Sequence, residues 1–394
     1  MDTRTVGVIT GTRADYGLLY GLLRALDTDD AFRLRLVVTG MHLSGEFGHT
    51  VEEIEKDGFS IDARVDMLVS SDSAVGTAKS VGLGVIGFAD ALDDLDLDVL
   101  VVLGDRFEML AAAQAALLLR IPVAHIHGGE TTEGAFDESI RHSLTKMAHY
   151  HFVTADPYRR RVIQMGEQPE RVVTVGAPGL DQIRHTDLLT REQFESCLNV
   201  PLGDRAFLVT VHPATLAETE TGQTVGAVLD ALDRFDDASI LFTKANADPD
   251  GREINRILAE YCAHRSNCRL FDSLGQKRYL SALQHVDVVV GNSSSGLIEA
   301  PAFDVPTVNI GPRQDGRLRA PSVIDCEEQA DAIAQAIQQA CSPSFRTQIE
   351  GAGSPYGQGY AGKTIAHHLK RVALDNDVLR KEFYDLDAVP SVDA

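Results

Sequence analysis

The chain has 394 residues, of which 44% are apolar and 24% are charged. It is too long for one compact core, so we expect two domains of about 150 to 200 residues each. Its 36 basic and 58 acidic residues give a formal net charge of −22. This acidic balance excludes nucleic acids and anionic membranes as partners, and an anionic ligand then needs a local basic or dipolar pocket.

The cysteines and the N-terminal residues predict a soluble cytoplasmic protein. The 5 cysteines lack CxxC spacing, which indicates reduced thiols and neither a disulfide framework nor a metal site. No charged-then-apolar leader precedes the first strand, and no uninterrupted apolar stretch reaches membrane-spanning length. The apolar, glycine-bearing stretch from Val81 to Ala91 is predicted to be a buried helix.

In the first half, apolar β-branched runs alternate with helical periodicity, which is typical of a doubly wound parallel sheet. The predicted strands are Arg4 to Thr10, Arg33 to Thr39, Val99 to Leu103, Pro122 to Ile126, His151 to Thr154 and Arg171 to Val175. A domain boundary is expected between Gly179 and Asp204, where a helical piece leads into a turn.

The second half repeats the α/β pattern without repeating the sequence of the first. Its predicted strands are Ala206 to Val211, Ser239 to Thr243, Arg269 to Phe271, Val286 to Val290 and Pro306 to Ile310. A final helix from Ala361 to Leu374 and a poorly ordered acidic tail complete the chain. We therefore expect an α/β fold with two Rossmann-like domains, at 1–185 and 186–360, facing each other across a cleft, followed by 361–394.

Three polar clusters follow predicted strands or open a helix in the first half. They contain Asp105 and Arg106, then His127 and Glu130, then Asp137 and Arg141. Open α/β sheets bind ligands at the carboxyl ends of their strands, and unpaired buried charge costs several kcal/mol. These clusters therefore predict a polar active site in preference to a solvated group of loops.

The turn after the first strand contains Thr12, Arg13 and Asp15. It has neither the GxGxxG spacing nor the GK[ST] ending, so dinucleotide and P-loop nucleotide sites are excluded. Backbone N–H groups at this strand-to-helix turn favour an anion, and Arg13 can add a charge-assisted contact to phosphate. Asp15 fits a binding role and a helix-capping role equally well.

A second turn of small residues predicts a diphosphate site in the second half. Asn292, Ser293 and Ser294 lie between glycines after a strand. Glu299 lies one turn into the predicted next helix. Its carboxylate can accept hydrogen bonds from ribose hydroxyls, or its negative charge can stabilise the positive N-terminal end of that helix. Arg313 follows the next strand and is placed to neutralise a diphosphate.

His212 ends a strand just before a proline, which predicts a proton-transferring imidazole in the same site. The alternative is a structural loop histidine whose ring nitrogens form hydrogen bonds within the fold. His142, His149 and His151 are expected to have mostly structural roles.

Taken together, these motifs resemble the UDP-N-acetylglucosamine 2-epimerases, and within them the hydrolysing branch that makes N-acetylmannosamine or its analogues for sialic and legionaminic acids. The resemblance covers about residues 4–370. The motifs that carry it are Thr12-Arg13-Ala14-Asp15-Tyr16, Gly104-Asp105-Arg106-Phe107, Gly128-Gly129-Glu130, Asp137 with Ile140-Arg141-His142, Gly176-Ala177-Pro178-Gly179 and Gly291-Asn292-Ser293-Ser294-Ser295-Gly296.

The resemblance implies a glycosyltransferase-B-like fold whose final helix returns to the first domain. It also implies anti elimination of UDP to a 2-acetamidoglucal, followed by addition of water with inversion at C2, without a cofactor or metal. Asp105 and Asp137 match the catalytic acids of the family, and His212 matches the histidine near the leaving phosphate. The residues that match UDP contacts are Arg13, Ser293, Ser294, Glu299 and Arg313. We add Asp15, Arg106, Arg141 and Asn292 as substrate-binding candidates.

One departure concerns His127, where many relatives have glutamate. Either His127 transfers the proton, or Glu130, three residues later, does so. The same change is consistent with a different sugar, such as the 2,4-diacetamido-2,4,6-trideoxy sugar diacetylbacillosamine.

Three other functions remain open at this point. A non-hydrolysing epimerase would return UDP-N-acetylmannosamine, although the arginine after Asp105 argues against that branch. A glycosyltransferase of the same fold would need an acceptor groove, and a nucleotide-sugar sensor would bind without turnover. The expected partners are a UDP-sugar and further copies of the chain, as a homodimer or homotetramer.

Overall fold

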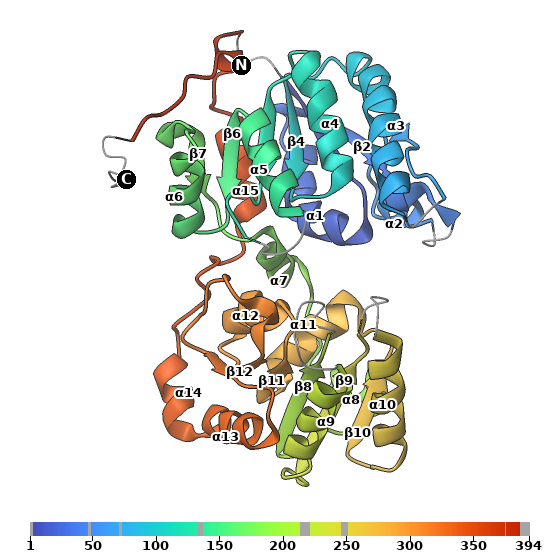
Figure 1. The fold of residues 1–394 in the computed structure, drawn as a ribbon, viewed down its shortest axis with the longest axis vertical. Helices are drawn as coiled ribbons and strands as arrows, with labels where there is room; N and C mark the ends of the chain where they lie inside the picture. Colours follow the sequence, from blue (N-terminus) through green and yellow to red (C-terminus); the bar gives the residue numbers. More distant parts are fainter. Residues whose placement is uncertain are drawn as a thin grey trace, which may run out of the picture. The chain divides into compact units, whose positions relative to one another are not determined.

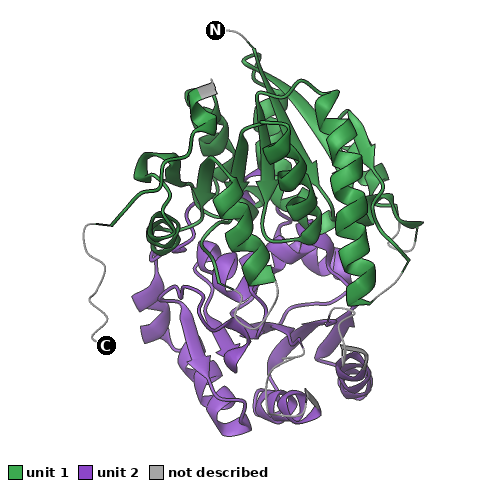
Figure 2. Ribbon diagram, turned by 45° about the horizontal axis from the view of Figure 1, so that its top comes forward, with its two compact units in different colours: residues 1–182, 359–394 green, residues 183–358 purple. Residues whose placement is uncertain are grey.

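The computed structural model describes residues 3–45, 49–70, 73–131, 137–212, 221–245, 251–374 and 376–386. The chain divides into two compact units, one formed by residues 1–182 and 359–394 and the other by residues 183–358 (Figure 2). Each unit is described separately below.

The first unit contains a seven-stranded sheet in the order β3-β2-β1-β4-β5-β6-β7, and all of its described strand pairs are parallel. Its strands are β1 (Arg4–Thr10), β2 (Phe32–Thr39), β3 (Ala63–Val65), β4 (Val99–Leu103), β5 (Val123–Ile126), β6 (Tyr150–Val153) and β7 (Val172–Thr174). The chain reverses its direction of winding between β1 and β4, which makes that point the switch point of a doubly wound sheet.

Helices cover both faces of this sheet (Figure 1). They are α1 (Arg13–Asp27), α2 (Val51–Lys56), α3 (Ala74–Asp93), α4 (Phe107–Leu118), α5 (Asp137–Met147), α6 (Asp156–Gln164) and α15 (Ala361–Leu369), with α7 (Asp181–His185) at the junction of the two units. Two apolar clusters fill the space between the sheet and these helices. They are centred on β-branched and leucine side chains, as expected for strands buried on both faces.

The second unit repeats the same winding with a six-stranded parallel sheet in the order β10-β9-β8-β11-β12-β13. Its strands are β8 (Arg205–Thr210), β9 (Ala238–Thr243), β10 (Cys268–Phe271), β11 (Val288–Gly291), β12 (Thr307–Ile310) and β13 (Val323–Cys326). Its helices are α8 (Arg191–Leu198), α9 (Thr221–Leu232), α10 (Gly251–Ala263), α11 (Gly275–His285), α12 (Ser295–Ile298), α13 (Ala330–Cys341) and α14 (Pro343–Ile349).

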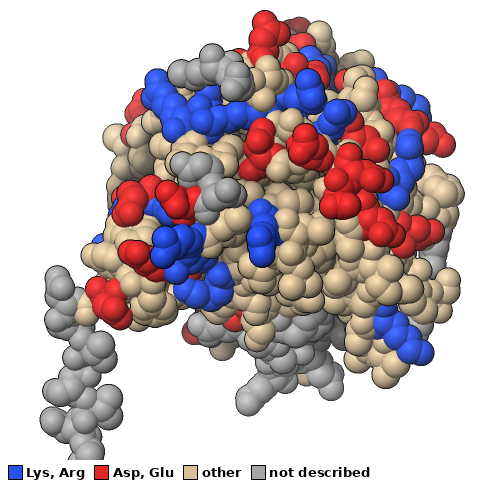
Figure 3. All heavy atoms as spheres, turned by 90° about the horizontal axis from the view of Figure 1, so that it is seen from above, with Lys and Arg blue, Asp and Glu red and all other residues tan. Residues whose placement is uncertain are grey.

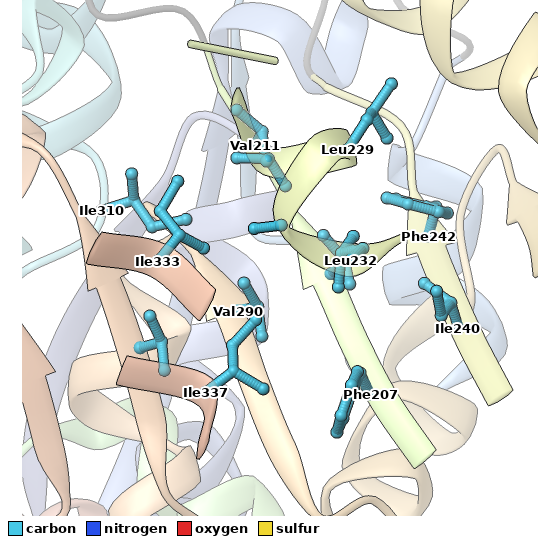
Figure 4. Packing of buried hydrophobic residues seen from close by; sticks show 14 of the residues in the cluster. Phe207, Val211, Leu229, Leu232, Ile240, Phe242, Val290, Ile310, Ile333 and Ile337 are labelled. Carbon is cyan, nitrogen blue, oxygen red and sulfur yellow. The ribbon is translucent and has the colours of Figure 1, made fainter. Parts of the chain in front are cut away.

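The core of the second unit is a layer of aliphatic and aromatic side chains between the sheet and helices α9 and α13. In Figure 4, Phe207 of β8 lies below Leu232 of α9 and Phe242 of β9 lies beside it, and Val290 lies beside Ile337 of α13. All five side chains are buried. Their burial, about 1.5 to 3 kcal/mol for each large side chain, stabilises the unit.

The predicted α/β class with two parallel sheets is confirmed, and the structure adds two short strands at sheet edges. β3 has 3 residues and β13 has 4. Neither forms a long apolar run, because edge strands need little burial to complete a sheet.

The predicted helix at Val81 to Ala91 is present, but it is buried on one side only. This stretch lies within α3, whose buried side carries Gly84 and Phe88, whereas Leu83 and Ile86 are exposed. Helical periodicity places residues four apart on one face, so only the Gly84 side packs on the sheet. By length and composition, α3 is the one helix in the described ranges that passes the test for a membrane span, but it packs against β3 and α4 in the first unit.

The final helix belongs to the first unit. It is shorter than predicted, ending at Leu369, and packs on α1. Gly362 lies so close to α1 that a Cβ atom there would be 2.4 Å from the backbone nitrogen of Leu22. Residues 376–386 of the predicted tail also dock on this unit, with Tyr384 donating a backbone hydrogen bond to Gly166 at 2.9 Å. The last eight residues of the tail lie outside the described residues.

Candidate active site

Asp105 and Arg106 follow β4 at the switch point of the first sheet. Gly104 has φ +81, a left-handed conformation that turns the chain out of the strand. Arg106 has extended backbone and is the N-cap residue directly before α4. The strand end and the helix start therefore hold Asp105 at the ligand-binding edge of the sheet.

Arg141 of α5 ties the three polar clusters together. Its side chain is almost fully buried and donates to the Asp105 carboxylate, to the Glu130 carbonyl at 3.0 Å and to Glu138 at 3.2 Å. A buried guanidinium needs such partners, because an unpaired buried charge is strongly destabilising. The sequence motif predicts that Arg141 lies near the acids. The structure shows that Arg141 contacts residues of all three polar clusters.

Asp137 opens α5 and has a raised pKa. Burial is the first cause, and the negative charge of Asp105 is the second. A carboxyl group with a raised pKa next to an ion-paired carboxylate is the pattern by which active sites separate a proton donor from a proton acceptor.

His127 and Glu130 lie side by side after β5. The His127 Nδ1 atom is 3.4 Å from a Glu130 carboxylate oxygen, and the same oxygen accepts a 2.8 Å hydrogen bond from Thr154 at the end of β6. The His127 Nε2 atom is buried and has no hydrogen-bond partner among the described residues. His127 also has φ 69, and a left-handed non-glycine residue costs roughly 1 to 3 kcal/mol, a strain that clusters at functional sites.

A second cluster of charged side chains in the first unit consists of Asp15, Arg106 and Glu108. Burial raises the pKa of Asp15 to about 6; Arg106 opposes the rise and Glu108 adds to it. Glu108 is fully buried and accepts hydrogen bonds from Arg106 at 2.7 and 3.1 Å. The sequence prediction missed Glu108, although a carboxylate in an apolar first turn after Arg106 is a visible signal. Arg13, by contrast, is 63% exposed at the start of α1, 3.8 Å from Glu53.

The other histidines of this region have structural roles. His125 is buried and contacts the Gly104 carbonyl at 2.8 Å, and burial lowers its pKa to about 3. His149 accepts a hydrogen bond from the Val123 backbone at 3.1 Å, and burial lowers its pKa to about 4. His151 is buried 2.9 Å from Glu167. Neutral imidazoles in these positions hold strand ends in place.

In the second unit, Asn292 and His212 follow the neighbouring strands β11 and β8 at the switch point. The Asn292 side chain accepts from the His212 N–H at 2.7 Å and donates to the His212 carbonyl at 2.9 Å. The Asn292 carbonyl accepts from Arg313 at 3.1 Å and from Gln314 at 2.8 Å. One asparagine therefore fixes the histidine segment and the arginine loop.

The serine turn differs from its prediction in one respect. The helix after Ser293 and Ser294 is the single turn α12, which ends before Glu299, so Glu299 lies where the chain passes into a 3-10 turn (Ala300–Phe303). One Glu299 carboxylate oxygen is buried without a hydrogen-bond partner among the described residues, and burial raises the pKa of this group. Tyr279, which the sequence prediction missed, donates to Ser295 at 2.7 Å.

The predicted residues thus form one group in each unit. The first unit gathers Asp15, Arg106, Asp105, Arg141, Asp137, Glu130 and His127, and the second gathers His212, Asn292, Ser293, Ser294, Glu299 and Arg313. Within the described ranges, no group of three or more histidine, cysteine or acidic side chains has metal-binding geometry. The first group is suited to proton transfer, and the second offers backbone amides, hydroxyls and a cation to a phosphate.

Two doubly wound parallel sheets with polar groups at their switch points define the glycosyltransferase-B-like class of α/β proteins. The fold matches that of the UDP-N-acetylglucosamine 2-epimerase from Neisseria meningitidis bound to UDP-N-acetylglucosamine, with a TM-score of 0.74 and 18% identity over 93% of this chain and 99% of that one. It also matches the Methanocaldococcus jannaschii enzyme in complex with UDP-N-acetylglucosamine and UDP, with a TM-score of 0.73 and 19% identity over 93% of this chain and 99% of that one.

The chain belongs to the UDP-N-acetylglucosamine 2-epimerase family, whose model matches residues 24–370. A Campylobacter jejuni relative named GDP/UDP-N,N'-diacetylbacillosamine 2-epimerase (hydrolyzing) is 40% identical over 388 residues, which is 98% of this chain and 100% of the relative. A Legionella pneumophila relative named UDP-N,N'-diacetylbacillosamine 2-epimerase (hydrolyzing) is 36% identical over 96% of this chain and 98% of the relative. The Escherichia coli polysialic acid biosynthesis protein P7 is 34% identical over 96% of both chains. The family resemblance drawn from the motifs is confirmed.

Proposed function

We propose that the chain is a hydrolysing 2-epimerase that converts UDP-N,N'-diacetylbacillosamine and water into the free 2-epimeric sugar and UDP. The observation that carries the proposal is the acid cluster of the first unit, where buried Arg141 holds Asp105 beside Asp137. Two relatives of nearly full length, at 40% and 36% identity, have names that contain this sugar and the hydrolysing reaction.

The reaction has two stages. In the first, a carboxylate removes the C2 proton while the C1–O bond to the diphosphate breaks, which yields UDP and a 2-acetamidoglycal with a double bond between C1 and C2. In the second, the oxygen of water adds to C1, and a proton adds to C2 on the face opposite to the one from which the first proton left, so that C2 is inverted. Both stages need a base and an acid held in a site from which bulk water is excluded.

The residues of the first unit take the proton-transfer roles in this proposal. Asp105 and Asp137 act as catalytic base and acid, with the ion pair to Arg141 orienting Asp105. His127 and Glu130 form the second pair, in which Glu130 stabilises the imidazolium that forms when His127 takes up a proton. Asp15 and Arg106 bind the substrate. In this proposal, His127 and Glu130 together replace the single glutamate that many relatives have at the position of His127.

The residues of the second unit bind the leaving group. Arg313 and the turn of Ser293 and Ser294 stabilise the diphosphate through charge-assisted and backbone hydrogen bonds. The buried Glu299 carboxyl accepts hydrogen bonds from the ribose hydroxyls, and His212 protonates or holds the departing phosphate oxygen. Arg13, exposed at the start of α1 in the first unit, adds a cation for the same anion.

We also propose where the enzyme works, how it assembles and what its product is used for. We infer that it works in the cytoplasm without a metal or organic cofactor, assembles as a homodimer or homotetramer, and supplies a precursor of legionaminic or sialic acids. Full activity after exhaustive treatment with a chelator supports the metal-free mechanism.

The test is a panel of UDP- and GDP-linked 2-acetamido sugars, with products identified by NMR in the absence of any acceptor. We expect UDP and a free 2-epimeric sugar, with UDP-N,N'-diacetylbacillosamine turned over faster than UDP-N-acetylglucosamine. Return of a UDP-linked 2-epimer identifies a non-hydrolysing epimerase instead. Turnover only with an added acceptor identifies a glycosyltransferase, and binding without turnover identifies a sensor.

A further inference from the structure

The segment after α15 is held on the first unit by backbone and ring contacts. It comprises residues 376–386, dark red in Figure 1. The Tyr384 N–H donates to the Gly166 carbonyl at 2.9 Å. The ring of Phe383 lies directly on Gly166, where a Cβ atom would collide with it, and the Lys146 ammonium lies 5.0 Å from the centre of the same ring. The segment therefore occupies a defined position on the fold.

Lys381 is the charged residue that this segment places deepest in the unit. Its side chain is 23% exposed, whereas the other charged residues of the segment are exposed. The Lys381 ammonium donates to the backbone carbonyls of Lys146 at 2.9 Å and Ala148 at 2.5 Å, and it lies 2.7 Å from a Glu167 carboxylate oxygen. An ammonium group has three N–H donors, so these three acceptors satisfy all of them.

The two carbonyls that Lys381 binds lie at the C-terminal end of α5. Lys146 is in the last turn of this helix, and Ala148 directly follows it. The last four carbonyls of a helix have no partner inside it, and the helix dipole favours a cation at this end. Lys381 therefore caps α5 from positions that are 235 and 233 residues away along the chain.

Glu167 keeps other partners when Lys381 is changed. The buried Glu167 carboxylate accepts a hydrogen bond from Lys146 at 2.6 Å and lies 2.9 Å from the His151 Nε2 atom. Although burial raises the pKa of Glu167, hydrogen bonds from His151, Lys146 and Lys381 lower it to about 2. Removal of the Lys381 charge therefore leaves Glu167 paired, and the strong destabilisation caused by an unpaired buried charge is avoided.

The opposite end of α5 carries two groups of the candidate active site. Asp137 is its first residue, and Arg141, one turn later, donates to the Asp105 carboxylate and to the Glu130 carbonyl. A helix of 11 residues is about 16 Å long, and its hydrogen-bonded backbone moves as one body. A shift of the C-terminal end along the helix axis therefore displaces Asp137 and Arg141 by the same distance.

We propose that Lys381 is a positioning residue for the 2-epimerase reaction. By capping the C-terminal end of α5, it sets the axial position of the helix and thereby the position of Asp137 and Arg141 relative to Asp105. This inference rests on the proposed function, because that function assigns proton transfer to these carboxyl groups. Lys381 acts only through α5.

The first experiment compares wild type with Lys381→Met, which keeps the length of the side chain and removes the cap, on the UDP-sugar that the wild type turns over. We expect kcat to fall about tenfold, because a displacement of about 1 Å can lower a rate by up to about 100-fold. KM and the UDP dissociation constant from calorimetry should change by less than about twofold, since the lost interaction acts in the transition state.

Two further variants distinguish the cap from a general effect. Lys381→Arg keeps the charge and the N–H donors and is expected to restore most of the wild-type kcat. Lys363→Met removes an exposed lysine of α15 and is the matched control, with unchanged kcat. Unchanged kcat in Lys381→Met overturns the proposal. So does a fall in kcat that is matched by a fall in the number of UDP sites per chain, because that result indicates loss of folded enzyme.

Hydrogen–deuterium exchange tests the cap without reference to turnover. Exchange in residues 137–147 should be faster in Lys381→Met than in wild type and unchanged in Lys363→Met, because a helix end without its cap opens more often. If the wild-type chain turns over no UDP-sugar, the proposed function fails, and this measurement alone decides the cap. Equal exchange of α5 in wild type and Lys381→Met overturns it.

Discussion

At the scale of single residues, the site depends on how each charge is paired. Asp105 is held by a buried arginine, whereas Asp137 sits close to the negative charge of Asp105 and has a raised pKa. Two carboxyl groups in such different environments suit different steps of one reaction. The Glu130 carboxylate is shared between His127 and Thr154, which gives the imidazole a fixed partner.

Removing either catalytic carboxylate should abolish most of the activity without loss of UDP binding. We expect Asp105→Asn and Asp137→Asn each to lower kcat at least about 100-fold, because proton transfer contributes a factor of about 10² to 10⁴. The UDP dissociation constant from calorimetry should change little. Asp27→Asn, on the exposed end of α1, is the matched control. Near-normal rates in both site variants contradict the carboxylate assignment.

Restoring a glutamate at His127 tests which group of the pair transfers the proton. A carboxyl group titrates about two pH units below an imidazole in model compounds, so His127→Glu should move the acidic limb of the kcat/KM profile to lower pH. Thr154→Val removes the hydroxyl donor to Glu130 and leaves His127 in place. A limb that moves in Thr154→Val and stays in place in His127→Glu assigns the proton transfer to Glu130.

The diphosphate contacts predict a graded loss of UDP affinity. Charge-assisted hydrogen bonds to phosphate are worth roughly 1.5 to 3 kcal/mol and neutral ones about half as much, so Arg313→Ala should weaken UDP binding more than Ser294→Ala. Calorimetry with UDP measures both. Arg256→Ala, which removes an exposed arginine on α10, should have no effect. Unchanged affinity in both site variants moves the diphosphate site elsewhere.

At the scale of elements, the return of α15 to the first unit depends on a cap from a distant part of the chain. Asp181 is buried and accepts hydrogen bonds from the backbone N–H groups of Ala361 at 2.8 Å and Gly362 at 2.6 Å. These are the first two residues of α15, whose N–H groups have no partner inside the helix. The negative charge also favours the positive end of the helix dipole.

Loss of this cap should destabilise the first unit. Asp181→Ala leaves two buried N–H groups without acceptors, and we expect a loss of about 1 to 3 kcal/mol in the free energy of unfolding, measured by urea denaturation. Asp187→Ala changes an exposed aspartate six residues later and should leave the stability unchanged. Equal stability of the two variants excludes a capping role for Asp181.

At the scale of the whole molecule, each of the two units has a doubly wound sheet with polar side chains at its switch point. Acidic and basic side chains lie close to one another on the face shown in Figure 3, even though the chain has a net charge of −22. An acidic protein needs local features to bind a nucleotide diphosphate, and we propose that Arg313 and the turn of Ser293 and Ser294 supply them.

Isotope labelling should reveal the glycal route in the intact enzyme. In the proposed elimination the C2 hydrogen leaves as a proton and is replaced from solvent, so product formed in D2O should carry deuterium at C2. Since the C1–O bond breaks on the sugar side, reaction in ¹⁸O-water should label the anomeric oxygen and leave UDP unlabelled at short reaction times. The measurements are NMR and mass spectrometry of the product, and retention of protium at C2 excludes elimination.

The amino-acid sequence by itself determined the α/β class, most strand positions and the family. These features depend on local patterns: buried parallel strands require continuous apolar runs, and strand-end motifs such as Gly104-Asp105-Arg106-Phe107 keep their spacing along the chain. The short strands β3 and β13 escaped prediction because edge strands carry little apolar signal. The predicted buried helix at Val81 to Ala91 has an exposed side, because composition does not show which side of an apolar helix is covered.

Only the tertiary structure decided which side chains meet. The contact of Arg141 with Asp105 spans 36 positions in the chain, and that of Glu130 with Thr154 spans 24. Such contacts depend on the order of strands in the sheet and on backbone turns such as the left-handed His127. Hydrogen bonds and ion pairs act over a few ångströms, so they are set by the positions that packing gives to distant elements and not by spacing along the chain.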